Sequence, residues 1–140
     1  MKMSTRGRYG ARAMLDIALN CDKGPVPLKD MSQRQQISIK YLEQLIQPLK
    51  TAGLIKSVRG AGGGYTLARL PQEISLLQIV TALERLSPTD CVEAPEACPR
   101  AGKCVAHDVW QEVQNSINDV LASFTLMDMA ERQLEKDAEH

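Results

Sequence analysis

The chain has 140 residues, of which 44% are hydrophobic, 24% charged and 4% aromatic, a composition typical of one globular domain with or without an extra arm. No apolar run is long enough to cross a bilayer, and the basic segment 1–12 is not followed by the apolar stretch of a secretory signal. We therefore expect a cytoplasmic protein with no membrane partner.

The net charge of zero results from two halves of opposite sign. Residues 1–69 carry twelve Lys and Arg against four Asp and Glu, a net charge of +8, whereas residues 70–140 carry five against thirteen, a net charge of −8. A basic half joined to an acidic half favours a module that binds a polyanion such as nucleic acid, although two solvated surfaces would give the same counts.

In the basic half, apolar residues at helical spacing predict three helices separated by turn residues. Ser38 is suited to cap the third helix, because its hydroxyl can accept from the free amides of the first turn. Pro48 lies inside that helix and predicts a kink or an early end, and Gly53 provides a left-handed stop. The predicted helical ranges are 6–19, 28–35 and 39–51.

Two β-like runs, 54–58 and 65–68, flank a glycine-rich link and predict a hairpin. Ser75 then caps a further helix that runs to about Leu86. A short helix, a break, a second helix and a hairpin follow one another in a winged helix-turn-helix. The expected fold class is therefore mainly α with a small β-hairpin, followed by a long dimerisation helix.

The acidic half begins with an irregular segment, because several prolines and a glycine prevent a long helix between residues 87 and 106. Residues 109–127 form the longest helical pattern, with apolar residues at alternating steps of four and three, as in a coiled coil. A second copy of the chain is the expected partner, although this seam could pack on its own domain. The apolar seam consists of Val113, Ile117, Val120, Phe124 and Met127. The expected parts are a DNA-binding domain 1–86, a cysteine-containing loop 87–107, a dimerisation helix 108–130 and a flexible tail 131–140.

The second helix of a helix-turn-helix enters the major groove with its N-terminal residues near base edges. Gln44 could pair with adenine, Glu43 could accept from cytosine or face solvent, and Tyr41 could meet a phosphate or a thymine methyl. Arg59 could enter a narrow minor groove from the root of the hairpin. The candidate DNA-binding residues are Ser38, Lys40, Tyr41, Glu43, Gln44, Arg59 and Gly60, with further phosphate contacts expected from Arg6, Arg8, Lys29 and Lys56.

Three of the four cysteines fall within fourteen residues and are followed by a histidine, in the order Cys91, Cys98, Cys104 and His107. Thiolate-rich sites favour zinc or an iron–sulfur cluster. Gaps of six and five residues are looser than those of most structural zinc sites, so the residues alone predict a metal site without naming the metal. His107 could instead face solvent, and Cys21 is expected to be a small buried hydrophobic residue.

Over residues 1–130 the chain resembles the IscR-type (BadM/IscR) bacterial iron–sulfur regulators. The resemblance rests on Arg6-Gly7-Arg8-Tyr9, the segment 13–20, Tyr41-Leu42-Glu43-Gln44-Leu45, Ser57-Val58-Arg59-Gly60, Gly62-Gly63-Gly64-Tyr65 and Cys104-x2-His107-x2-Trp110. The gap between Cys91 and Cys98 is longer than in the family pattern, and Lys40 and Pro48 depart from it as well.

The resemblance implies a homodimer that binds a palindromic promoter site in double-stranded DNA and holds a 2Fe-2S cluster through Cys91, Cys98, Cys104 and His107. It implies a repressor of cluster-assembly genes that senses cluster status. Alternatives are a nitric oxide or redox sensor of the same family with a 4Fe-4S cluster, an iron–sulfur carrier, and a zinc-stabilised DNA-binding protein. We expect no enzyme, because the sequence has no acid–base pair, nucleophile motif or substrate fingerprint.

Overall fold

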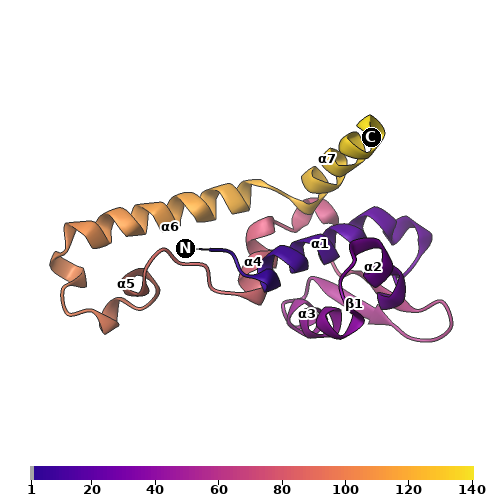
Figure 1. Cartoon of the computed structure of the whole chain (residues 1–140), viewed down its shortest axis with the longest axis horizontal. Helices are drawn as coiled ribbons and strands as arrows, with labels where there is room; N and C mark the ends of the chain where they lie inside the picture. The colour runs from indigo at the N-terminus through magenta and orange to yellow at the C-terminus, as the bar shows by residue number, and fades with distance from the viewer. Residues whose placement is uncertain (1) are drawn as a thin grey trace.

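The computed structural model describes residues 2–140 and shows a winged helix-turn-helix head from which one long helix projects (Figure 1). The head contains α1 (Thr5–Asn20), α2 (Leu28–Gln35), α3 (Ile39–Thr51), β1 (Ile55–Val58), β2 (Gly64–Leu67) and α4 (Leu76–Leu83). The short α5 (Asp90–Glu93) and the long α6 (Val105–Ser123) lie beyond the head, and α7 (Leu126–Glu139) returns to pack on α1. Between residues 2 and 140, every helix is too short or too polar to traverse a lipid bilayer.

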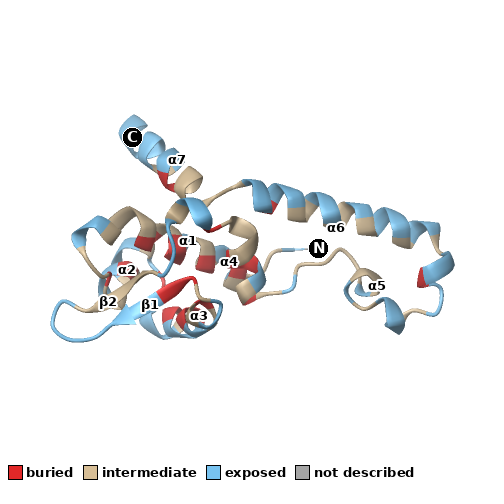
Figure 2. Ribbon diagram, turned by 180° about the vertical axis from the view of Figure 1, so that it is seen from behind, coloured by how far each residue is buried: buried red, intermediate tan, exposed pale blue. Residues whose placement is uncertain are grey.

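The core of the head lies where the apolar stripes of α1, α3 and α4 meet, as their helical spacing predicted (Figure 2). Burial of one such aliphatic side chain stabilises the fold by about 1.5–3 kcal/mol, so this cluster dominates the stability of the head. The large apolar side chains that are almost fully buried are Met14, Ile17, Met31, Leu42, Leu45, Leu49, Leu54, Ile74, Ile79, Val80 and Leu126.

The predicted hairpin is confirmed within one residue at each strand. β1 and β2 are antiparallel, with Ile55 opposite Leu67 and Val58 opposite Gly64. Val26, just before α2, adds a bridge to Tyr65 through two backbone hydrogen bonds of 2.8 and 2.9 Å. The wing is therefore tied directly to the segment that leads into the helix-turn-helix.

The predicted ends of α3 are also confirmed. The Ser38 hydroxyl accepts from the Tyr41 amide at 3.1 Å, and Gly53 after the helix has a φ of 75°. Pro48 does not end the helix early, since α3 continues to Thr51 and the carbonyl of Pro48 accepts from the Ala52 amide at 2.9 Å. Packing of Leu45 and Leu49 in the core holds this segment helical despite the missing amide.

The C-terminal third differs from its sequence pattern. Where the spacing predicted one helix over 109–127 and a flexible tail over 131–140, the chain forms α6, a break at Phe124, and α7 through Glu139. Phe124 and Thr125 are extended, and residues 124–126 pair with 74–76 through hydrogen bonds of 2.9 and 2.8 Å. The break lets Leu126 enter the core of the head, where it is completely buried.

Candidate functional site

The exposed face of α3 carries most of the residues predicted to contact DNA. Ser38, Lys40, Glu43 and Gln44 are all exposed, while the opposite face of the helix is buried in the core. The wing presents Arg59 and Gly60, both exposed, directly after β1. The head thus brings a helix face and a hairpin loop to its surface, the two elements that a winged helix-turn-helix applies to duplex DNA.

Tyr41 differs from the other residues of that group, because its side chain is turned toward α1. Its hydroxyl donates to Thr5 Oγ1 at 3.1 Å, and its ring meets that of Tyr9 edge to face, with centroids 5.8 Å apart. A phosphate would need the hydroxyl proton that Thr5 already accepts. In this conformation Tyr41 braces α3 on α1 instead of projecting toward a nucleic acid.

Among the residues expected to contact phosphate, Arg6 also has a partner inside the head. Its Nε donates to the carbonyl of Leu83 at 3.0 Å, which satisfies one of the free carbonyls at the end of α4. Arg8, Lys29 and Lys56 are exposed, so they keep the positive charge of the head accessible. This bond links α1 to α4, and phosphate contact by Arg6 stays a prediction.

A buried carboxylate, Asp16, holds α1 against α2 through a contact that helical spacing did not predict. Asp16 is 1% exposed and accepts from Arg34 at 3.0 and 2.8 Å and from Gln35 at 3.0 Å. The hydrogen bonds to Asp16 raise the pKa of Arg34 above its usual value, so the guanidinium stays protonated. The sequence carried one sign of this contact, an acidic residue between the apolar Leu15 and Ile17. A charge inside an apolar stripe is seldom buried without a partner.

The four candidate metal ligands lie around the loop that joins the head to α6, at the end of α6 away from the head (Figure 1). Cys91 is in α5, Cys98 follows a short helical turn, Cys104 is the N-cap of α6, and His107 is in its first turn. All four side chains are partly buried. Within residues 2–140, no three His, Cys, Asp or Glu side chains come close enough together to hold one metal ion.

Two observations nevertheless fit a metal at this loop. His107 Nδ1 is buried and has no hydrogen-bond partner, so the imidazole has an unused position for a ligand bond. The donor set of three thiols and one imidazole is the soft combination that zinc and iron–sulfur clusters select.

Two of the cysteine thiols have polar neighbours in the structure. Cys91 Sγ lies 3.1 Å from Thr89 Oγ1, and the thiol of Cys21, far from the loop, donates to the Ala18 carbonyl at 3.4 Å.

Comparison with protein families gives one match over nearly the whole chain. A family model described as "Rrf2: Iron-dependent Transcriptional regulator" matches residues 3–132. The HTH-type transcriptional regulator IscR of Aliivibrio salmonicida is 43% identical over 127 residues, which are 90% of this chain and 75% of that protein.

Two solved structures agree with the whole arrangement of helices and hairpin. T. potens IscR matches with a TM-score of 0.79 and 44% identity, covering 95% of this chain and 88% of that one. CymR (YrzC), the global cysteine regulator of B. subtilis, matches with a TM-score of 0.74 and 38% identity, covering 94% and 98%. These neighbours confirm the winged-helix fold class, and all three named proteins are transcriptional regulators.

Proposed function

Because the chain belongs to the Rrf2 family of iron-dependent transcriptional regulators, and is itself a DNA-binding regulator of the IscR type and not an enzyme, we propose that it is an iron–sulfur sensor. In this proposal it represses genes for iron–sulfur cluster assembly and senses cluster status through a bound 2Fe-2S cluster. Because a DNA-binding regulator must reach the chromosome, the proposal includes a cytoplasmic location.

The DNA-binding part of the proposal rests on exposed residues of the head. The N-terminal half of α3 enters the major groove, where Gln44 and Glu43 meet base edges while Ser38 and Lys40 meet the backbone. Arg59 and Gly60 of the wing approach the adjacent minor groove. Tyr41 contributes indirectly, by fixing the position of α3 on α1.

The homodimer is supported by an apolar groove along α6. Val109, Val113, Ile117 and Val120 line it together with Leu121, and its volume is about 530 Å³. Val109 is 46% exposed and Val120 is 57% exposed, which is unfavourable for a monomer in water. Two antiparallel copies of this face form a two-fold dimer, and such a dimer matches a palindromic promoter site with half-sites roughly 34 Å apart.

The metal-binding part rests on the ligand set Cys91, Cys98, Cys104 and His107, and the single observation that carries it is the buried, unpartnered Nδ1 of His107. A 2Fe-2S cluster at these residues would make the occupancy of the site depend on iron, sulfide and redox conditions. In the structure the four side chains do not surround one point, and we propose that the loop draws them together when it holds the cluster. A ligand can shift DNA affinity only if it binds two conformations of the protein with different affinities. The change of the loop provides these two conformations.

The chain offers a route from this loop to the head. α5 packs against α6 and α6 packs against α4, while an exposed ion pair of 3.8 Å between Glu93 of α5 and Arg85 adds little to this contact. α4 in turn packs on α1 and α3. A rearranged loop therefore acts on the helix that supports the DNA-binding face.

The test is a visible absorption spectrum with iron, sulfide and zinc analysis on the anaerobically purified full chain. We expect visible absorption bands with equal iron and sulfide, and loss of those bands in His107→Ala but not in Cys21→Ala, the matched control. A colourless protein with stoichiometric zinc that takes up no iron and sulfide would contradict the sensor and leave a zinc-stabilised DNA-binding protein. If low nitric oxide abolishes DNA binding by a protein holding a 4Fe-4S cluster, the nitric oxide sensor replaces the proposal.

A further inference from the structure

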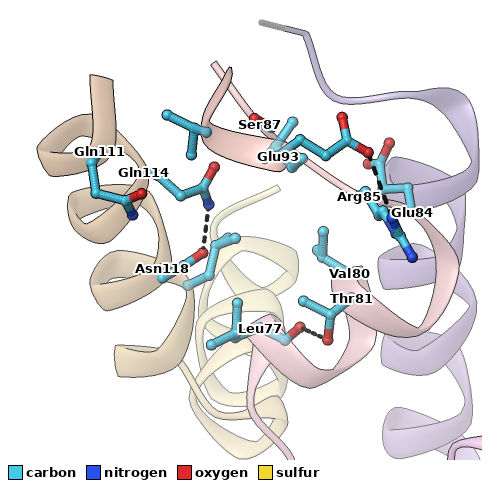
Figure 3. A pocket seen from close by; sticks show the side chains of 13 residues that line it. Leu77, Val80, Thr81, Glu84, Arg85, Ser87, Glu93, Gln111, Gln114 and Asn118 are labelled. Atoms are coloured by element: carbon cyan, nitrogen blue, oxygen red, sulfur yellow. Dashed lines mark hydrogen bonds and ion pairs between the residues drawn. The ribbon is translucent and has the colours of Figure 1, made fainter. Parts of the chain in front are cut away.

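The end of α4 is the point where the head passes into the chain that carries the clustered cysteines. Glu84 is the C-cap of this helix, with an extended backbone, and its amide donates to the Val80 carbonyl at 2.9 Å. A few residues later the chain enters α5, which holds Cys91. Figure 3 shows Glu84 at this exit from α4, next to Arg85. On this side of the cysteine-containing loop, Glu84 is therefore the first residue of the head.

The side chain of Glu84 is bound to the start of α1. Both of its carboxylate oxygens accept from the amide of Ser4, the N-cap of α1, at 3.3 and 3.1 Å. The preceding Leu83 carbonyl accepts from Arg6 Nε at 3.0 Å. A carboxylate is favourable here because the amides at a helix N-terminus lack partners within the helix and carry partial positive charge. Two consecutive residues at the end of α4 thus hold the first turn of α1.

Two glycines of α1 make room for this contact. Gly7 and Gly10 lie one turn apart, and both are buried. A Cβ on Gly7 would overlap Glu84 Oε1, and a Cβ on Gly10 would overlap the Leu83 side chain. Only a helix face without side chains lets the end of α4 approach α1 this closely. The contact therefore depends on residues of both helices.

The same first turn of α1 also holds the DNA-binding helix. Thr5, the residue after Ser4, accepts from the Tyr41 hydroxyl at 3.1 Å, and the ring of Tyr9 meets the Tyr41 ring one turn later. Glu84 and Tyr41 are thus bound to neighbouring residues of α1. A shift of this turn moves the hydrogen-bond partner of Tyr41, and Tyr41 belongs to α3.

We propose that Glu84 is a positioning residue for DNA recognition, which transmits the state of the cysteine-containing loop to α3 through the first turn of α1. Glu84 also lines a cavity of about 310 Å³ whose walls include Val92 and Glu93 of α5, so a displaced α5 changes its surroundings. The intact contact with Ser4 holds α3 in its DNA-binding position. This inference rests on the proposed function, because it names the contact through which the loop acts on the DNA-binding face.

Two variants break this contact in the full chain without iron. Glu84→Ala removes both acceptors, and Gly7→Ala puts a methyl group in the place of the Glu84 oxygen while favouring helix formation. In NMR spectra of the ¹⁵N-labelled protein, we expect the amide signals of Ser4 and of residues 40–44 of α3 to shift in both variants. They should stay in place in Glu73→Ala, the matched control, which removes an exposed carboxylate. Signals of 40–44 that do not move when Ser4 shifts would overturn the proposal.

DNA affinity shows whether the contact serves recognition. It is measured by fluorescence anisotropy on a duplex that the unaltered chain has selected from random sequences. We expect Glu84→Ala to bind about fivefold more weakly, as the loss of one hydrogen bond predicts, and Glu84→Gln, which keeps an acceptor, to bind almost normally. Thr5→Val removes the acceptor of Tyr41, and adding it to Glu84→Ala should cause no further loss, because both changes break the same route. Additive losses, or unchanged affinity in Glu84→Ala, would contradict the proposal.

A last measurement separates this proposal from the iron–sulfur function. DNA affinity is compared before and after a chelator removes the metal, and Glu84→Ala should bring the ratio of the two affinities close to one without changing the visible absorption. An undiminished ratio would rule out transmission by Glu84. A chain that never holds metal would contradict the proposed function instead, while the NMR spectra and the double variant would still decide whether Glu84 positions α3.

Discussion

At the scale of single residues, Asp16 shows how a polar contact fixes the geometry of the helix-turn-helix. It is the buried charged residue of the described chain, 2–140, and its carboxylate takes three hydrogen bonds from Arg34 and Gln35. Arg12 on the same face of α1 also donates to Gln35, through Nε at 3.3 Å. These bonds join α1 to α2 in one orientation, which apolar contacts alone do not specify.

We predict that Asp16→Asn lowers the free energy of unfolding by about 1–3 kcal/mol, because the fully buried side chain loses the charge that pairs with Arg34 and its amide group cannot accept both arginine hydrogen bonds. Arg85→Gln is the matched control. It also breaks an arginine–carboxylate pair, but that pair is 3.8 Å long with 86% of the arginine side chain exposed, and it contributes about 0–1 kcal/mol. Urea unfolding followed by circular dichroism measures both, and equal losses would contradict the prediction.

At the scale of elements, the wing depends on the close approach of two backbones. A Cβ on Gly64 would lie 2.4 Å from the carbonyl carbon and oxygen of Val26, the residue that bridges to Tyr65. Only a residue without a side chain lets β2 come this close to the segment before α2.

We therefore predict that Gly64→Ala destabilises the head by about 1–3 kcal/mol and weakens DNA binding, because the wing must move away from Val26. In Gly102→Ala a Cβ would meet nothing within 4 Å, so its effect on the free energy of unfolding is expected to be small. Chemical unfolding together with fluorescence anisotropy on DNA would test both variants. If Gly64→Ala were as stable as Gly102→Ala, the backbone contact would not govern the wing.

The starts of α4 and α7 form a second pair of linked elements. Each has a capping box, Ser75 with Gln78 and Thr125 with Asp128, and Ser75 and Thr125 pair in a β-bridge. Hydrogen bonds from the backbone and hydroxyl of Thr125 lower the pKa of Asp128 below its usual value. The two boxes differ in charge, since Gln78 does not titrate.

This difference predicts a local pH dependence. The pKa of Asp128 is lower in the folded protein than in the unfolded chain, so its cap is fully present above about pH 4 and is lost as the pH falls through the folded value. Amide hydrogen exchange in the first turn of α7 should then rise, while the first turn of α4, capped by Gln78, serves as the internal control. Equal acid sensitivity of both turns would assign the change to global unfolding.

At the scale of the whole molecule, charge and shape divide the chain into two functions. The basic residues gather in the first half, which forms most of the head, and the acidic residues in the second half, which forms α5, α6 and α7. α6 projects from the head (Figure 2), and among the described residues 2–140 Val109 and Val120 on its apolar face stay 46% and 57% exposed. This division fits a head that binds DNA and an arm that binds another copy.

We predict that Ile117→Glu converts the protein to a monomer, because a charge in the apolar groove would be buried in the dimer without a counterion. Ala122→Glu, at an exposed position of the same helix outside the groove, should leave the dimer intact. Analytical ultracentrifugation at micromolar concentration distinguishes the two, and DNA affinity should fall only in the monomer. A dimeric Ile117→Glu variant would mean that another surface joins the copies.

The sequence by itself determined the local structure of the head. Helical spacing identified α1, α2 and α3, glycine and serine identified their ends, and the β-like runs around the glycines identified the hairpin. These features depend on neighbouring residues along the chain, such as a hydroxyl three residues from an amide, so they can be inferred without the fold. The exposed residues of α3 and the wing followed from the same patterns.

Only the tertiary structure decided how distant segments meet. Residues 124–126 leave the helical pattern because they pair with 74–76 and send Leu126 into the core, and the periodicity of 109–127 contains no sign of that contact. In the fold, α1 supplies Thr5 and Tyr9 as partners of Tyr41, and α4 supplies a carbonyl to Arg6, and the sequence pattern indicated neither contact. Periodicity records which face of an element is apolar, whereas the partner of a polar side chain depends on segments that folding brings together.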